Sequence, residues 1–168
     1  MSPDVDNERT ALYSAELAAF DGTDLEVGLG HDFVACQIQD VVTGEWWPGP
    51  SIEVRQARVD ARASSTRCAL DADNGSTAMI RLAVEQTTTA TAAHELAHAL
   101  AGVAVGHGPV FRRAYLDVLA VITNLDSTNR RRDLHVAQLA AAFVARDLSV
   151  GDRQWAAPPL EDVGPIAL

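Results

Sequence analysis

Residues 88 to 103 constrain the fold more than any other stretch of the chain. Leu96 and Leu100 recur there at helical spacing, and His94 and His98, also four positions apart, project from the other side of the same predicted helix. Two unpaired histidines are costly to bury in a segment this apolar. A shared metal ion removes that cost, because each imidazole then gives one nitrogen to the ion. The stretch therefore predicts a buried helix that carries two metal ligands on one face.

Glu95 directly follows the first histidine and completes the pattern H-E-x-x-H. A carboxylate in this position lies beside the ion and can accept a proton from a water molecule. Catalytic zinc sites usually combine three protein ligands, often imidazoles, with one open position. The pattern therefore predicts a Zn2+ cofactor held by His94 and His98, with Glu95 as the general base of a hydrolytic reaction. Two histidines hydrogen-bonded inside an ordinary core are the alternative.

A third zinc ligand has to come from outside the pentapeptide. The long zinc motif, with a glycine and a third histidine soon after H-E-x-x-H, is absent because Ala101 and Ala104 occupy those positions. A glutamate from a downstream helix is also excluded, because the only later glutamate is Glu161, in the predicted tail. His107 is the favoured ligand, since the glycines on both sides of it allow the chain to turn back sharply toward the helix. Asp117 is the alternative, either as a ligand or as the hydrogen-bond partner of a ligand histidine.

The composition fits one globular domain. The chain of 168 residues can bury a core without disulfides, and with 48% hydrophobic but only 5% aromatic residues this core must be built mainly of aliphatic side chains. Residues 1 to 151 carry the periodic segments and are expected to form a single domain. Residues 152 to 168 contain several prolines and show no period, so they are expected to be a frayed tail. Trp155 within that tail could instead cover a cleft.

The charge distribution excludes several classes of partner. The net charge is -10, none of the basic residues is lysine, and residues 1 to 35 contain Arg9 as their only basic residue among many acidic ones. Such a chain repels nucleic acid and anionic lipid, and the run Arg130 to Arg132 is expected to be a solvated helix face. No apolar run approaches the ~20 residues that cross a bilayer. With only Cys36 and Cys68 present, we expect a cytoplasmic protein with reduced thiols, in an oligomeric state that the sequence leaves open.

Hydrophobic periodicity predicts an α+β fold, in which a small sheet of about three strands packs on the metal-binding helix with further helices around it. The other helices are expected over residues 5–20, 31–42, about 109–124 and about 127–148, and a strand over 52–55. A β-hairpin is expected over residues 66–83 around Asn74-Gly75. An odd-numbered loop would place Leu70 opposite Ile80 and Cys68 opposite Leu82 on one face.

Several further residues have rival roles near the ion. Tyr115, Arg112 and His135 are candidates for stabilising an oxyanion. His135 or Asp117 could instead close a structural zinc site as a fourth ligand, which would make the protein a non-catalytic binding protein. A hydrolase of non-peptide amides or esters is a third alternative, because substrate choice depends on the shape of the pocket. For a peptide substrate, residues 77–83 offer a strand edge to which an extended backbone could add.

The residues around the motif resemble a known group of enzymes. His94-Glu95-Leu96-Ala97-His98, followed by Gly106-His107-Gly108-Pro109-Val110-Phe111-Arg112, is similar to the H-E-x-x-H and H-G-P-x-F pattern of small metallohydrolases of high-GC actinobacteria, and more distantly to minigluzincins and SprT-like metallopeptidases. The resemblance covers about residues 88–120 and extends loosely to residues 12–16.

This resemblance implies a zincin-like fold and zinc bound by His94, His98 and His107. It also implies Glu95 as the catalytic base and a peptide or protein as the substrate, cleaved at its amide bonds. The chain differs from SprT-like proteins because it lacks the cysteines of their zinc ribbon. Its acidity also removes their link to DNA.

Overall fold

Helices and strands follow one another in the order that the periodicity predicts. The computed structural model describes residues 3–71, 75–124 and 129–159. They contain the α-helices α1 (Pro3–Phe20), α2 (His31–Thr43), α3 (Thr89–Ala101), α4 (Pro109–Asn124) and α5 (Asn129–Val144) and the strands β1 (Ser51–Gln56), β2 (Ser65–Asp71) and β3 (Gly75–Leu82). Three short 3-10 helices, η1 (Asp24–Glu26), η2 (Val84–Gln86) and η3 (Val103–Val105), lie between them. The architecture is α+β, as expected.

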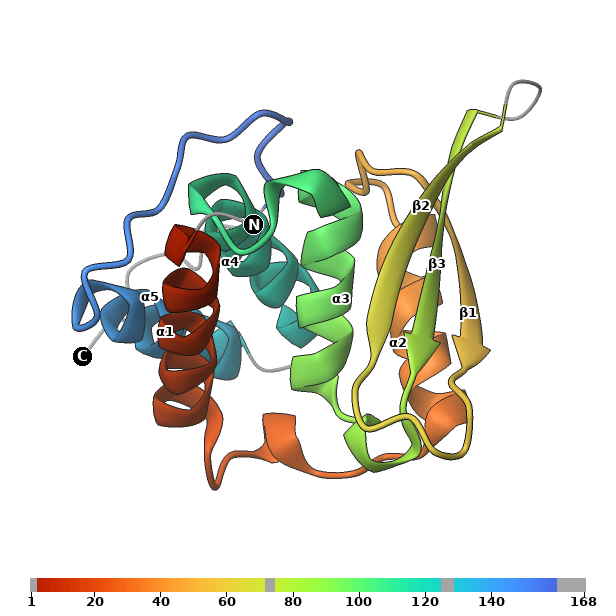
Figure 1. Ribbon diagram of the computed structural model, residues 1–168, viewed down its shortest axis with the longest axis horizontal. Helices are drawn as coiled ribbons and strands as arrows, with labels where there is room; N and C mark the ends of the chain where they lie inside the picture. Colours follow the sequence, from red (N-terminus) through yellow and green to blue (C-terminus); the bar gives the residue numbers. More distant parts are fainter. Residues whose placement is uncertain (1–2, 72–74, 125–128, 160–168) are drawn as a thin grey trace.

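The three strands form one mixed sheet in the order β1-β3-β2. β1 runs parallel to β3, and β2 runs antiparallel to it. Alternate residues of β3, namely Ala78, Ile80 and Leu82, are buried, as expected for a strand with one face on the core. Helices α2 and α3 cover that face of the sheet (Figure 1). β3 therefore occupies the centre of the sheet, with both of its edges paired.

The register of the hairpin differs from the expected one. Cys68 pairs with Ala78 and Leu70 pairs with Ser76, so the predicted pairs with Leu82 and Ile80 are wrong. The loop is odd-numbered as expected, because Asp71 pairs with Gly75; Asn74 itself lies outside the described residues. Registers that differ by an even number of residues keep every side chain on the same face. Cys68 is exposed on the edge strand β2. Burying this side chain therefore does not favour the predicted register over the observed one.

Local signals set the limits of the helices around the motif. The Thr88 hydroxyl accepts a hydrogen bond of 3.1 Å from the Thr91 amide and caps the start of α3. Gly102, with φ 90°, ends this helix in a conformation that favours glycine, and Pro109 occupies the first turn of α4. α5 ends at Val144, before the predicted limit near 148, because the chain turns through Asp147, whose φ is 53°.

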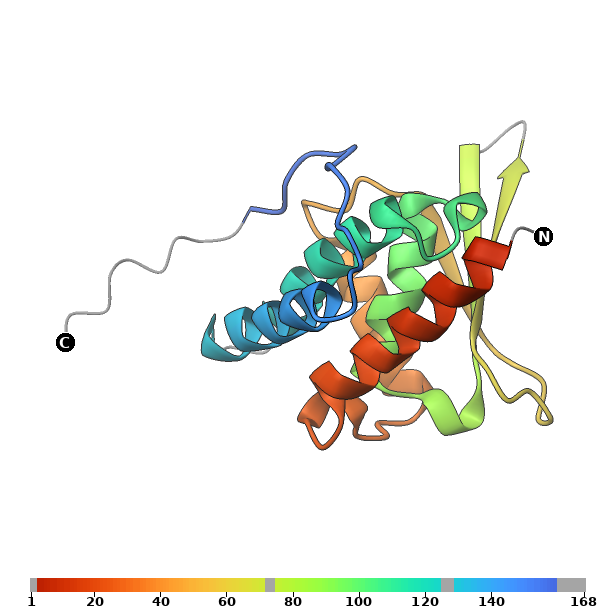
Figure 2. The same ribbon diagram turned by 60° about the vertical axis from the view of Figure 1, so that its left-hand side comes forward.

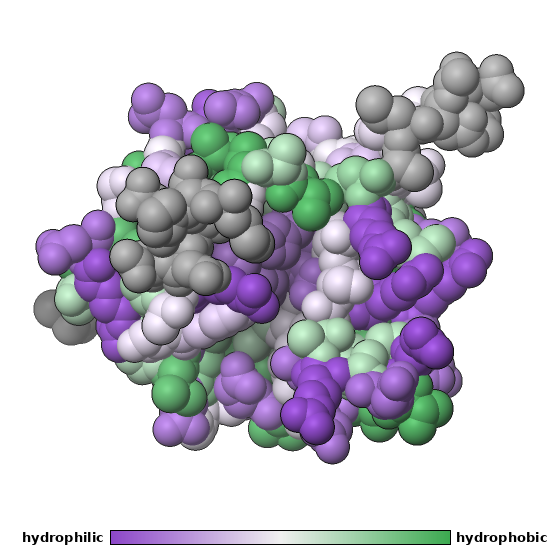
Figure 3. All heavy atoms as spheres, in the orientation of Figure 1, coloured by the Kyte–Doolittle hydropathy of each residue, from purple (hydrophilic) through white to green (hydrophobic). Residues whose placement is uncertain are grey.

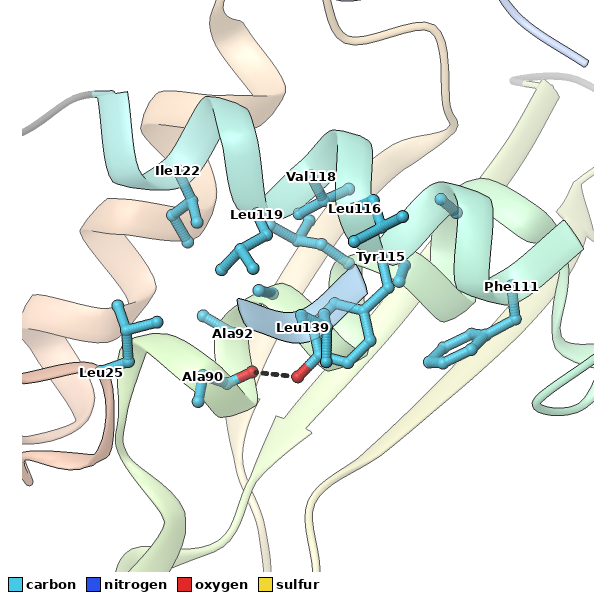
Figure 4. Packing of buried hydrophobic residues seen from close by; sticks show 14 of the residues in the cluster. Leu25, Ala90, Ala92, Phe111, Tyr115, Leu116, Val118, Leu119, Ile122 and Leu139 are labelled. Carbon is cyan, nitrogen blue, oxygen red and sulfur yellow. Dashed lines mark hydrogen bonds between the residues drawn. The ribbon is translucent and has the colours of Figure 1, made fainter. Parts of the chain in front are cut away.

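α3 lies at the centre of the molecule, between the sheet and α4. Phe111, Tyr115, Leu119 and Ile122 form a buried stripe on α4, and Figure 4 shows Tyr115 and Leu119 directed toward the small residues Ala90 and Ala92 of α3. Truncating one such buried side chain to alanine costs about 2–5 kcal/mol, so this packing holds α3 firmly in place.

α1 completes the fold on the other side of α3 from the sheet. It packs against α5 (Figure 2), and in Figure 1 it stands in front of α4 and to the left of α3. The surface is hollowed between the α1 side and the sheet side, with hydrophilic residues on the floor of the hollow (Figure 3). No helix of the described segments has the length and apolar character that a membrane crossing requires.

Candidate metal centre

Three imidazoles converge on one point beside the α3 helix. His94 and His98 project from α3, and His107 returns to them from the turn between η3 and α4. His107 Nε2 lies 3.2 Å from His98 Nε2 and 3.4 Å from His94 Nε2. Gly106, with φ 54°, allows the sharp turn that brings His107 back. The structure thus brings together the three histidines that the sequence singles out.

All three candidate ligand nitrogens lie within 4.8 Å of one another, and two of their separations match those around a tetrahedral ion. Zn–N bonds of about 2.0–2.1 Å at tetrahedral angles separate two ligand nitrogens by about 3.3–3.4 Å. The two distances of 3.2 and 3.4 Å agree with this value. No other histidine, cysteine, aspartate or glutamate among the described residues joins the group. The donor set is therefore three imidazoles, which suits Zn2+ and leaves a coordination position without a protein ligand.

Glu16 of α1 binds the imidazole of His94 at Nδ1, the ring nitrogen that does not face the other two histidines. His94 Nδ1 donates a hydrogen bond of 2.6 Å to Glu16 Oε1, and the two side chains are only 11% and 16% exposed. Because a carboxylate only accepts, the proton shared with Glu16 lies on Nδ1, and the ring presents a lone pair on Nε2 once it has lost its second proton. Burial acts to lower the pKa of His94, but the Glu16 carboxylate outweighs it and the pKa is raised. Partners of this kind fix the orientation of zinc-binding histidines.

The other two imidazoles are kept neutral by their surroundings. Burial, together with the charge of His94, lowers the pKa of His98 to about 3 and that of His107 to about 4. Both rings pack against Phe111, at centroid distances of 4.4 and 5.0 Å. Neutral imidazoles carry the free lone pair that a metal ion needs, so these two ligands are ready to bind a cation at physiological pH.

Glu95 lies one residue beyond the first ligand and is held by the edge strand. Thr66 Oγ1 of β2 donates to Glu95 Oε2 at 2.5 Å and lies 3.0 Å from the Glu95 carbonyl oxygen. Burial raises the pKa of Glu95, partly offset by His94 and by the Thr66 hydroxyl. A buried carboxyl with a raised pKa and a fixed orientation is the usual state of a general base.

A cleft of about 440 Å³ opens onto the site between α1 and the segments that precede β2 and α3. His94 and Glu95 line it, together with Glu16 and Tyr13 of α1. Tyr13 is 43% exposed. Its ring stacks on His94 at 6.0 Å and meets His107 edge-on at 5.7 Å. A substrate could therefore approach the first histidine and Glu95 from solvent, past an aromatic ring.

Two candidates from the sequence lie away from the three converging histidines. Asp117 accepts hydrogen bonds from Arg153 Nε and Nη2, at 2.6 and 2.9 Å, and from Trp155 Nε1, at 2.9 Å, so its contacts do not support the alternative in which it is a ligand or the partner of a ligand. His135 Nε2 lies 3.2 Å from Asp24, and His135 lines a separate cavity of about 480 Å³ between η1, α2, the end of α4 and the middle of α5. It therefore cannot be the fourth ligand or stabilise an oxyanion at this site.

The other two oxyanion candidates have hydrogen-bond partners within the fold. Arg112 donates to two backbone carbonyls, of His107 and Ser149. The Tyr115 hydroxyl is fully buried, within hydrogen-bonding reach of Glu16 and 3.5 Å from the Ala90 carbonyl (Figure 4). Arg112 is therefore engaged by the backbone and does not line the cleft, whereas Tyr115 lines the cleft with its hydroxyl directed toward Glu16.

Glu16, Thr66 and Tyr13 are functional candidates that sequence reasoning missed. The first two lie 78 and 29 positions from their partners on α3, and no local pattern marks such distant pairs. Only the loose agreement around residues 12–16 pointed toward α1. Comparison of the chain with protein-family models, curated proteins and solved structures found no match.

Proposed function

We propose that the protein is a zinc-dependent hydrolase with a zincin-like fold, and that it acts as a metallopeptidase. The observation that carries this proposal is the convergence of His94, His98 and His107, whose candidate ligand nitrogens lie within 4.8 Å of one another, with Glu95 and His94 lining the adjoining cleft. A coordination position without a protein ligand favours a catalytic site over a structural one. The likeness of residues 88–120 to small actinobacterial metallohydrolases supports the same conclusion.

Glu95 performs the proton transfers in the proposed reaction. A bound zinc ion would supply Lewis acidity toward a water molecule and a substrate carbonyl. Glu95 accepts a proton from that water and then donates it to the leaving amine. Its raised pKa brings the carboxyl closer to neutral pH, which favours both steps, and Thr66 keeps the carboxylate in one orientation. Glu16 keeps the His94 lone pair directed at the ion.

The sheet changes the expected position of an extended peptide. Residues 77–82 of β3 pair with β1 on one side, and most of them pair with β2 on the other, so the predicted addition to residues 77–83 is wrong. β2 is the edge strand next to α3, and residues 63 and 64 just before it line the cleft. We therefore propose that a peptide backbone adds to the outer edge of β2, which brings it past Glu95.

Glu95→Gln tests the proposed function. We expect the variant to bind about one zinc per chain, as the wild type does, and to lose about 10²–10⁴-fold of its activity on peptides, because the amide cannot take the proton. Elemental analysis measures the zinc, and a peptide library set against small amides and esters measures the turnover. Glu53→Gln is a matched control, because Glu53 is exposed on β1 and pairs with Arg55.

Full activity of Glu95→Gln would reject the mechanism. Turnover of small amides or esters without cleavage of peptides would keep the chemistry and reject the peptidase assignment. If the zinc-loaded wild type cleaves none of these substrates, the hydrolase proposal is rejected, and the alternative of a non-catalytic, zinc-stabilised binding protein is kept.

A further inference from the structure

Residues 149–156, here called the C-terminal strap, lie against the turn that carries His107. The Gly151 amide donates to the Pro109 carbonyl at 2.9 Å. The Arg113 guanidinium donates from Nε to the Gly151 carbonyl at 3.0 Å. Pro109 begins α4 two positions after His107, so these bonds fasten the strap next to the third candidate ligand.

One guanidinium joins the strap to the ligand turn itself. Arg112 is 1% exposed, donates from Nε to the Ser149 carbonyl at 2.6 Å and donates from Nη1 to the His107 carbonyl at 2.7 Å. Its Nη2 also lies 3.7 Å from Glu8 of α1. Hydrogen bonds from a charged donor are short and strong, and the rigid fork of the guanidinium fixes the two carbonyls relative to each other.

At Gly151 the strap lies very close to Pro109, the first residue of α4. A Cβ added at Gly151 would lie 3.0 Å from the carbonyl carbon and 3.1 Å from the carbonyl oxygen of Pro109. These are backbone atoms, so the neighbours cannot yield by changing a rotamer. A larger residue at position 151 must therefore shift the strap or the first turn of α4 by at least a few tenths of an ångström.

The far end of the strap is also fixed. Arg153 and Trp155 bind Asp117 of α4, and Trp46 Nε1 donates to the Ala156 carbonyl at 2.9 Å. No residue of the strap is among those that line the metal cleft. The strap therefore touches the back of the ligand turn and does not cover the site, contrary to the role considered for Trp155.

We propose that the C-terminal strap, acting through Arg112, is a positioning element for the metal ligand His107. The proposal rests on the metal site put forward above. His107 lies in a turn flanked by two glycines, which restrain the backbone little, so the hydrogen bond to its carbonyl supplies the missing restraint. Loss of groups that orient a metal ligand typically weakens metal binding by 10–100-fold.

The test compares zinc affinities of the full-length protein by competition with a chelator, without any substrate. In Arg112→Lys a single ammonium replaces the fork, and we expect binding to weaken by about 10–100-fold. Gly151→Val, which leaves Arg112 intact, should weaken binding in the same direction, and it decides the question if Arg112→Lys does not fold. Gly28→Ala is the control, because a Cβ at Gly28 meets nothing within 4 Å, and it should bind as the wild type does.

Amide hydrogen exchange of the metal-free proteins gives a second readout, independent of zinc. We expect faster exchange at residues 105–110 in the two strap variants and unchanged exchange in β3. Wild-type zinc affinity in both variants, with unchanged exchange in the ligand turn, would overturn the proposal. A wild type that binds zinc but cleaves no peptide would contradict the proposed function and leave this proposal intact.

Discussion

Replacing Arg153 by alanine should expose how much the far end of the C-terminal strap contributes to stability. Asp117 is 4% exposed and accepts two hydrogen bonds from Arg153 and one from Trp155. Breaking a buried ion pair by removing one partner costs about 3–5 kcal/mol. The Arg153 side chain is itself 35% exposed, so water can partly replace it and we expect the lower end, about 3 kcal/mol. At about 2–4 °C per kcal/mol for a chain of this size, Tm falls by about 6–12 °C.

Urea denaturation of the metal-free protein measures this loss directly. Arg55→Ala is the matched control, because Arg55 pairs with Glu53 at the surface, and such pairs contribute at most about 1 kcal/mol. Adding Asp117→Asn to Arg153→Ala should recover part of the stability, since an unpaired amide is less costly to bury than an unpaired carboxylate. A loss for Arg153→Ala no larger than that of Arg55→Ala would refute the reasoning.

Two further predictions concern the metal centre itself. Glu16→Gln keeps an acceptor for His94 but removes the charge, so zinc affinity should fall about tenfold, and a chelator competition that finds no change would contradict the role of Glu16. At pH 6, the lowered pKa values of His98, about 3, and His107, about 4, leave both rings unprotonated, while the raised pKa of His94 leaves it protonated. Zinc binding should then release about one proton, against about 2.3 for three histidines with the ordinary pKa of about 6.5, and affinity should rise with pH by about tenfold per unit. Calorimetry in buffers of different ionisation enthalpy measures this number, and a release of two or more protons would contradict it.

The helix that carries His94 and His98 and the turn after it could be predicted because their signals are local. The spacing of His94 and His98 sets their shared face on α3, and the glycines around His107 permit its return toward that helix. Pro109 similarly marks the start of α4. In each case residues within about 20 positions of one another carry both the chemistry and the geometry, so periodicity and turn preferences are sufficient.

The supporting contacts could not be predicted, because they join segments that are distant in the sequence. Glu16 contacts His94 only after α1 packs beside α3. In the sheet, β1 lies parallel to β3 on one side, and β2, the hairpin partner of β3, lies on its other side. Asp117 and His135 had the right chemistry for a metal site, but their helices direct them toward Arg153 and Asp24. Residue type alone therefore identified candidate ligands without showing where the folded chain would place them.

The hydrogen bonds of Arg112 have a consequence for the order in which the site is completed during synthesis. Ser149 follows His107 by about 40 residues. At about 5–20 residues per second, a ribosome therefore adds it about 2–8 s later. For most of that interval the nascent chain already contains His94, His98, His107 and Arg112, but not the Ser149 carbonyl that Arg112 also binds. Zinc captured early would thus be held by a turn with one of its anchors missing, and full affinity would develop only after Ser149 has been added and has reached Arg112.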